Sequence, residues 1–131
     1  MNEAFSFMTM LMVALGGACG AMSRYSVGII ATTLLGSGFP YGTLIVNSLG
    51  SAVMGIAATF FFHKYHLTHS MALFLMVGFL GAFTTYSSFA LETMNLFMSS
   101  QHHLALLNAF LNVSLSVLCV FLGMLLMKNF L

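Results

Sequence analysis

The sequence carries very few charges. Lysine, arginine, aspartate and glutamate make up 4% of its 131 residues, and the formal net charge is +1. Soluble domains contain roughly a quarter charged residues, so this chain lacks the polar surface that a water-soluble protein needs. A net charge so close to zero also offers little attraction for nucleic acid, and we expect no such partner. The composition excludes a soluble domain and predicts an integral membrane protein surrounded by lipid.

Proline, tryptophan and cysteine are also scarce. The chain has one proline, no tryptophan and two cysteines. Cys19 and Cys119 lie in apolar segments without CxxC or other ligand spacing, so we expect buried free thiols and no thiolate metal site. The sequence contains no serine–histidine–acid set in register, no metal cage and no phosphate-binding loop. We therefore expect that the chain is not an enzyme.

What the chain does have is long apolar segments, with 60% hydrophobic residues in total. A helix of about 20 residues spans a bilayer, and the length accommodates four such helices. The glycines and single proline of residues 36–40 indicate a turn, and polar residues at 63–69 and 99–103 indicate two more. We predict an all-α integral membrane protein with a single domain, 1–131, and helices at about 5–35, 41–62, 70–98 and 104–127.

The third apolar segment contains an unusual stretch, GFLGAFTTYSSFALE, at residues 78–92. Glycine weakens a helix, and serine and threonine hydroxyls compete for its backbone hydrogen bonds. In lipid, a break persists only where the freed backbone is buried in protein or lines a polar cavity. We predict a helix broken near its middle whose carbonyls and hydroxyls serve an ion. The alternative is a close-packing face whose hydroxyls bond back to the helix.

Polar side chains also occur at membrane depth in the other three segments. Arg24 either extends to the interface or faces a wet vestibule. Asn47 either joins helices or lines a pathway. Asn108, Asn112 and Ser116 recur at every fourth residue, so they share one helix face. Together with the hydroxyls of the third segment, these side chains predict a polar path for a small ion, without identifying the ion.

Three histidines, His63, His66 and His69, lie three residues apart in the second connection. This spacing is compatible with a metal site, but no acidic or thiol partner joins it. Residues at the membrane interface are the preferred interpretation.

The distribution of positive charge barely distinguishes the two sides of the membrane, so it orients the chain only weakly. A chain that inserts in both orientations is able to form an antiparallel dimer, which would provide the symmetry that inverted repeats provide within one chain. A dual-topology multidrug transporter coupled to protons is an alternative, but Glu3 and Glu92 are poorly placed for its embedded carboxylate. A structural assembly subunit is another alternative, and it leaves the asparagines and hydroxyls without a purpose.

Four stretches of the sequence resemble the Fluc fluoride channels, also called CrcB. They are GGACGAMSRY (16–25), GTLIVNSLGSAVMG (42–55), GFLGAFTTYSSFALE (78–92) and ALLNAFLNVSLS (105–116). They occur in the family's order, one in each apolar segment. The resemblance implies a passive, fluoride-selective channel of the bacterial cytoplasmic (inner) membrane that exports fluoride and relieves its toxicity. It also implies a dual-topology antiparallel homodimer with two pores.

The resemblance assigns roles to individual residues. The family's pore aromatics fall on Tyr86 and Phe89, and a structural sodium ion at the dimer centre is expected on the main-chain carbonyls of Gly81 and Thr84. No organic cofactor is implied. The complete set of expected fluoride-pathway residues is Asn47, Thr85, Tyr86, Ser87, Ser88, Phe89, Asn108, Asn112 and Ser116.

The third-segment motif departs from the family's usual pattern, Gly-Gly-Leu-Thr-Thr-Phe-Ser-Thr-Phe, and two of the departures bear on its expected function. Ala82 replaces a glycine and still fits a tight backbone. Tyr86 replaces a phenylalanine, and its hydroxyl needs a partner, so it either holds or obstructs the ion. The charged residues of the motifs fall on Arg24 and Glu92, which we expect in a vestibule or in a structural role.

Overall fold

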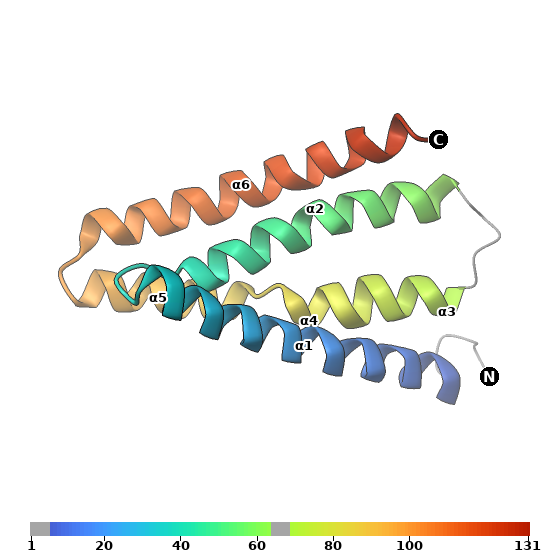
Figure 1. Ribbon diagram of the computed structural model, residues 1–131, viewed down its shortest axis with the longest axis horizontal. Helices are drawn as coiled ribbons and strands as arrows, with labels where there is room; N and C mark the ends of the chain where they lie inside the picture. The colour runs from blue at the N-terminus through green and yellow to red at the C-terminus, as the bar shows by residue number, and fades with distance from the viewer. Residues whose placement is uncertain (1–5, 64–68) are drawn as a thin grey trace.

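Four long apolar helices run back and forth along the molecule in a computed structural model that describes residues 6–63 and 69–131 (Figure 1). Each is long and apolar enough to cross a membrane, which confirms the predicted all-α membrane fold. The fourth helix begins slightly before its predicted start. The four spans are Phe7–Leu35, Tyr41–His63, Ser70–Met98 and His102–Lys128. A single domain and an antiparallel dimer stay predictions.

The first helix, α1 (Phe7–Leu35), has a clear signal at each end. The Ser6 hydroxyl accepts a hydrogen bond from the Thr9 backbone N–H at 3.2 Å, which caps the first turn. At the other end Gly36 has φ of +83°, a left-handed conformation that glycine adopts without strain. The turn that follows leads through Pro40 into α2 (Tyr41–His63).

The third crossing consists of several pieces. It begins with α3 (His69–Ala72), continues as a π-helical stretch, η2 (Leu73–Leu80), and reaches α4 (Gly81–Phe83). The backbone is then extended at Thr84, with ψ of 157°, and at Thr85, with φ of −150° and ψ of 117°. Helix α5 (Tyr86–Met98) resumes the crossing. The predicted break near the middle of the third helix is confirmed.

The last helix, α6 (His102–Lys128), runs beside α2 and in the same direction (Figure 1). Glycines allow these two backbones to meet, because a Cβ at Gly55 would overlap the carbonyl oxygen of Val120, and a Cβ at Gly123 would overlap that of Ala52. Such close approach is how helices associate in lipid, where the hydrophobic effect does not drive them together.

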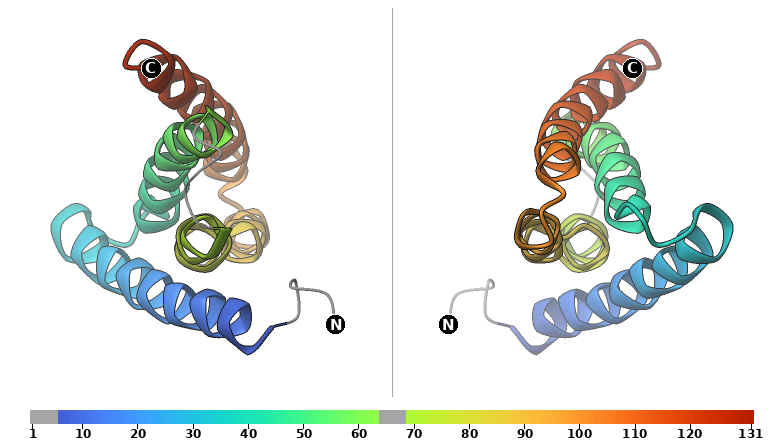
Figure 2. Two further views of the ribbon diagram at one scale, coloured as in Figure 1. Left: turned by 90° about the vertical axis from the view of Figure 1, so that its right-hand side faces the viewer. Right: turned by 90° about the vertical axis from the view of Figure 1, so that its left-hand side faces the viewer.

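Helix α1 packs against the first half of the third crossing, which lies between α1 and the α2–α6 pair (Figure 2). Gly16 and Gly20 again permit the contact. A Cβ on either would overlap a backbone carbonyl oxygen of η2, that of Phe74 or of Phe79. The small residues of the first motif therefore serve close packing.

The cysteines and histidines do not gather into a metal site in the described part of the chain. Both cysteines are free, but the burial prediction is wrong for Cys19, which lies on the exposed face of α1; Cys119 is half-buried. His66 lies outside the described residues, and the ring Nδ1 of His63 is 2.9 Å from the Thr59 carbonyl oxygen of its own helix. Within residues 6–63 and 69–131, no three His, Cys, Asp or Glu side chains gather as a metal site.

Candidate ion pathway at the break of the third helix

The side chain of Asn47, on α2, hydrogen-bonds to the backbone at the break. Its Oδ1 accepts a hydrogen bond from the Thr85 backbone N–H at 2.8 Å, and its Nδ2 donates to the Thr85 carbonyl oxygen at 3.1 Å. Thr85 is buried, and a buried backbone amide without partners is costly. One amide side chain thus replaces both helical hydrogen bonds of the extended residue.

The same contacts remove the usual helical partners of two carbonyl groups. In an unbroken α-helix the Thr85 N–H would donate to the Gly81 carbonyl, but here it donates to Asn47. The Ser88 N–H would donate to the Thr84 carbonyl, but it donates to Thr85 Oγ1 at 3.1 Å. Gly81 is exposed and Thr84 half-buried. These are the two carbonyls on which a sodium ion is expected, and uncharged oxygens of this kind suit a hard cation.

Behind the break, three asparagines and a threonine form a continuous chain of hydrogen bonds, here called the amide ladder (Asn47, Asn112, Asn108, Thr93). Asn47 Nδ2 donates to Asn112 Oδ1 at 2.9 Å, and Asn112 Nδ2 donates to Asn108 Oδ1 at 2.8 Å. Asn108 Nδ2 donates to Thr93 Oγ1 at 2.9 Å. The ladder joins α2, α6 and α5, so these asparagines link helices, and both Nδ2 hydrogens of Asn47 are engaged.

A groove of about 320 Å³, here called the break groove, opens beside the break between α2, α5 and α6. It brings together many of the expected pathway residues. Those that line it are Asn47, Thr85, Tyr86, Phe89, Asn112 and Ser116, and they are joined by Gly50, Ser51, Met54, Thr84, Val113, Val117 and Val120. Its walls combine amides and hydroxyls with apolar side chains.

The aromatic pair of the break groove lies at the start of α5. The ring centroids of Tyr86 and Phe89 are 5.4 Å apart, with an interplanar angle of 63°. Phe89 is buried, whereas Tyr86 is 78% exposed in the single chain. The edge of an aromatic ring carries partial positive charge, so this pair presents weak anion-attracting surface without a formal cation.

Three of the expected pathway residues lie outside the break groove. Asn108 is completely buried beneath it in the amide ladder. Ser88 faces the other side of α5, and its hydroxyl accepts from Thr85 Oγ1 at 3.0 Å. Ser87 is exposed, with its Oγ 3.5 Å from Thr85 Oγ1. Their roles in ion passage stay predictions.

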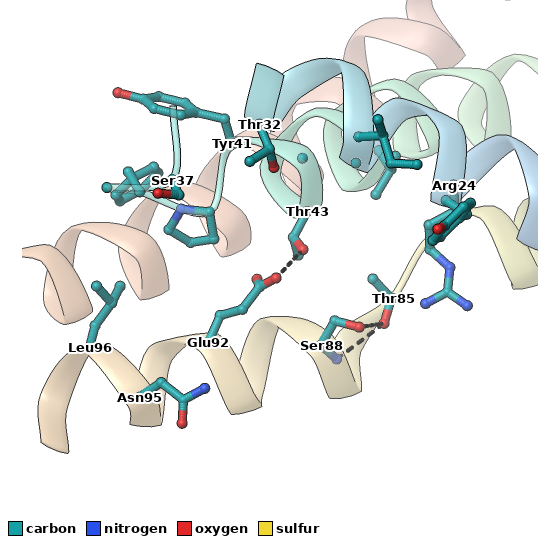
Figure 3. Close-up of a pocket in the computed structure, with 18 of the residues that line it drawn as sticks. Arg24, Thr32, Ser37, Tyr41, Thr43, Thr85, Ser88, Glu92, Asn95 and Leu96 are labelled. Carbon is teal, nitrogen blue, oxygen red and sulfur yellow. Dashed lines mark hydrogen bonds between the residues drawn. The ribbon is translucent and has the colours of Figure 1, made fainter. Parts of the chain in front are cut away.

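A second, larger cavity of about 700 Å³, here called the vestibule, lies between the later half of α1, the start of α2, and α5 (Figure 3). Arg24 and Glu92 both line it, as expected. Thr43 Oγ1 donates to Glu92 Oε1 at 2.8 Å. Arg24 Nε and Glu92 Oε2 are buried and have no hydrogen-bond partner within residues 6–63 and 69–131. The vestibule therefore contains charged groups with unused bonding capacity.

The position of Arg24 distinguishes the two interpretations of this residue. It lies well inside α1, which continues to Leu35, and its guanidinium extends toward Thr85 and Ser88 (Figure 3). This arrangement favours a cation facing a cavity over one extending to the interface. Thr85 lines both cavities, so the break separates the vestibule from the break groove.

Thr93 is the ladder residue that the sequence did not single out. It follows Glu92 directly, one position beyond the recognised motif, and its hydroxyl donates to the Phe89 carbonyl of the preceding turn at 2.8 Å. A threonine in a helix commonly makes such a bond. Its additional contact with Asn108 depends on how α5 meets α6, which sequence spacing does not reveal.

Comparison with known proteins gives a consistent result. The family described as CrcB-like protein, Camphor Resistance (CrcB), matches residues 11–124. A protein of Aeromonas salmonicida named fluoride-specific ion channel FluC is 49% identical over 116 residues, covering 88% of this chain and 93% of the relative. Proteins with the same name are similar to the chain in Magnetococcus marinus, at 46% identity over 112 residues (86% and 91% covered), and in Legionella pneumophila strain Paris, at 45% over 118 residues (90% and 88% covered).

Proposed function

We infer the function from one premise, that the chain belongs to the CrcB family, and we propose that it is a fluoride-specific ion channel. The chain is a multi-pass bacterial membrane protein with four spans. Its relatives at 45–49% identity are named as channels and not as enzymes, in agreement with the expectation from the sequence. The proposed role is passive export of fluoride across the cytoplasmic membrane, which relieves fluoride toxicity.

The observation that carries the proposal is the break groove. The whole sequence has three lysines and arginines, so an anion path has to rely mainly on neutral groups. The groove lines a short passage with the Tyr86–Phe89 edge pair, the Ser116 hydroxyl and the amides of Asn47 and Asn112. Small, strongly hydrated fluoride gains most from such close dipoles, whereas larger chloride fits a narrow passage less well.

Arg24 and Glu92 act at the entrance to this path. The vestibule leads to Thr85 from the side opposite the break groove. An arginine inside a membrane protein attracts anions into a water-filled cavity. We propose that Arg24 concentrates fluoride in the vestibule and that Glu92, bonded to Thr43, limits how strongly the anion is held there.

A sodium ion fits the carbonyls of Gly81 and Thr84. Both groups have lost their usual helical donors, to Asn47 and to the Thr85 hydroxyl. When bound, sodium supplies a fixed positive charge at the break that lowers the electrostatic cost of bringing an anion near. Asn47 and Thr85 hold the break open, and Gly81 and Thr84 bind the cation.

The functional unit we propose is an antiparallel homodimer with two fluoride pores. The exposed face of the break supports this arrangement, because Gly81 and the large apolar ring of Tyr86 are uncovered in the single chain. A second copy inserted in the opposite orientation would place two breaks back to back. It would also give each break groove a second wall.

Reconstituted transport tests the proposed function. Purified protein in liposomes loaded with fluoride should release it down its own gradient, while parallel liposomes loaded with chloride retain their contents. Fluoride efflux builds up a membrane voltage, which an ionophore has to discharge. A potassium ionophore should serve as well as a proton ionophore, because a passive channel needs no proton flux. Fluoride release at the rate of protein-free liposomes would reject the channel. Release that depends on an imposed proton gradient would instead indicate a coupled transporter, with Glu92 as the one carboxylate in the described residues.

A further inference from the structure

Thr93 stands at the end of the amide ladder, and the pathway described above gives it no role. A hydroxyl has one hydrogen to donate. The Thr93 hydroxyl donates it to the Phe89 carbonyl oxygen at 2.8 Å. Toward Asn108, at 2.9 Å, Thr93 Oγ1 can therefore only accept. This restriction forces the Nδ2 group of Asn108 to face α5.

The restriction passes along the ladder one amide at a time. With Nδ2 of Asn108 facing Thr93, its Oδ1 faces Asn112 and accepts from Asn112 Nδ2 at 2.8 Å. The same Nδ2 group is 3.2 Å from the Asn108 carbonyl oxygen, so both of its hydrogens face Asn108. Only Oδ1 of Asn112 remains for Asn47, and it accepts from Asn47 Nδ2 at 2.9 Å.

The last amide determines the backbone of the break. Because Asn47 Nδ2 faces Asn112 and the Thr85 carbonyl, its Oδ1 is left to accept the Thr85 N–H. With Asn47 in the reverse orientation, an NH₂ group would face that N–H, and two donors would oppose each other. The Thr85 N–H would then lose its partner and turn back toward the Gly81 carbonyl.

We propose that Thr93 is a positioning residue for the break. Its hydroxyl fixes the orientation of the Asn47 amide through Asn108 and Asn112, and so keeps the Gly81 carbonyl available. Asn108 is fully buried and Asn112 is 4% exposed, so water does not supply an alternative acceptor at these two central amides. The consequence for transport rests on the proposed fluoride channel, whereas the orientation of the amides does not.

Amide hydrogen exchange of the purified protein tests the proposal without fluoride. Valine has nearly the shape of threonine but lacks the Oγ1 that accepts from Asn108. In Thr93→Val the backbone amide hydrogen of Thr85 should therefore exchange with solvent about five to ten times faster than in the wild type. Thr93→Ser keeps the hydroxyl and should restore wild-type exchange. Thr59→Val is the control, because Thr59 is also a helical threonine whose hydroxyl donates to a preceding carbonyl, that of Gly55 at 3.0 Å, and Thr59 is even more buried than Thr93. It should leave Thr85 exchange unchanged.

Two results would overturn the proposal: wild-type exchange of Thr85 in Thr93→Val, or loss of protection in Thr93→Ser as large as in the valine variant. Thr93→Ala replaces valine if that variant does not fold, with the same expectations. In liposomes, Thr93→Val should slow fluoride release about tenfold and Thr93→Ser should recover it. If the wild type releases no fluoride, the channel proposal fails while the exchange data still decide the role of Thr93.

Discussion

Two helix contacts in this molecule solve the same problem in opposite ways. Where α1 meets η2, the two backbones touch directly, because Gly16 and Gly20 have no side chains. Carbonyl groups of η2 lie where the Cβ atoms of these two residues would be. Near the break, where α2 meets α5 and the first half of α6, the contact is made by polar side chains of the amide ladder. Only farther along do α2 and α6 also meet through glycines, Gly55 and Gly123. The first contact leaves no space for an added side chain, whereas the second depends on the direction of individual hydrogen bonds.

The difference explains where the ion path lies. Close glycine contacts leave no space for an ion and no polar group to attract one. The ladder side carries the break groove, and its contacts leave the carbonyls of Gly81 and Thr84 without their usual helical donors. A larger side chain should therefore do most damage where α1 meets η2. A change in the polarity of a side chain should do most damage at the amide ladder. The following changes test that division.

The largest effect is expected from Gly20→Val. The added carbons would collide with the Phe79 carbonyl of η2, which is backbone and cannot move aside. We expect a loss of stability of about 3 kcal/mol or more, seen as loss of the monodisperse protein peak after detergent extraction. Gly17→Val is the control, since a Cβ at Gly17 has nothing within 4 Å. Equal behaviour of the two variants would contradict the close-packing account.

Asn47→Asp should have the next largest effect, on transport more than on folding. The change replaces a donor with a negative oxygen that faces Asn112 Oδ1 and the Thr85 carbonyl, and it also repels a passing anion. We expect fluoride release to fall about a hundredfold, equivalent to about 3 kcal/mol. Asn129→Asp, at the exposed end of α6, makes the same charge change and should leave release unchanged. Normal release from the Asn47 variant would remove this residue from the path.

Gly50→Ala should have an intermediate effect, because it adds volume on the polar side. The new Cβ would overlap the Thr84 methyl group and lie 3.2 Å from the Phe83 ring, so it would push on the break itself. We expect fluoride release to slow about tenfold, with a loss of stability of about 1–3 kcal/mol. Gly17→Ala provides the control. A variant with a normal melting temperature and normal release would show that the position of Thr84 is not constrained by α2.

Tyr86→Phe should have the smallest effect. The hydroxyl belongs to a ring that is 78% exposed in the single chain, while the edge-on contact with Phe89 depends only on the ring. We expect unchanged selectivity over chloride and fluoride release that is equal or up to about twofold faster, since one competing polar group is removed. Abolished release from a well-folded variant would show instead that the hydroxyl is part of the path.

The fold could be predicted from the sequence because lipid imposes strong constraints on composition. The lengths of the apolar segments predicted the four membrane-spanning helices, and the run of hydroxyl residues from Thr84 to Ser88 predicted the break in the third helix. The π-helical character of Leu73–Leu80 could not be predicted, since a uniformly apolar run looks the same for either helix. The exposure of Cys19 was also missed, because lipid-facing and protein-facing surfaces are equally apolar.

The candidate site was predictable only in part. The spacing of Asn108, Asn112 and Ser116 identified a polar helix face, but it did not reveal that Asn112 contacts Asn47 or that Asn108 is fully buried. Those contacts depend on the register between α6 and its neighbours. Thr93 escaped notice for the same reason, since its local pattern is that of any helical threonine.

The most direct test of the whole account is fluoride release from liposomes in sodium and in a large organic cation, with chloride measured in parallel. If the Gly81 and Thr84 carbonyls hold sodium at the break, the wild type should release fluoride rapidly in sodium and retain chloride. Release should fall, or the protein should lose thermal stability, when N-methylglucamine replaces sodium on both sides. Fast fluoride release that is indifferent to the cation would contradict the account of the break, and no release in sodium would contradict the channel itself.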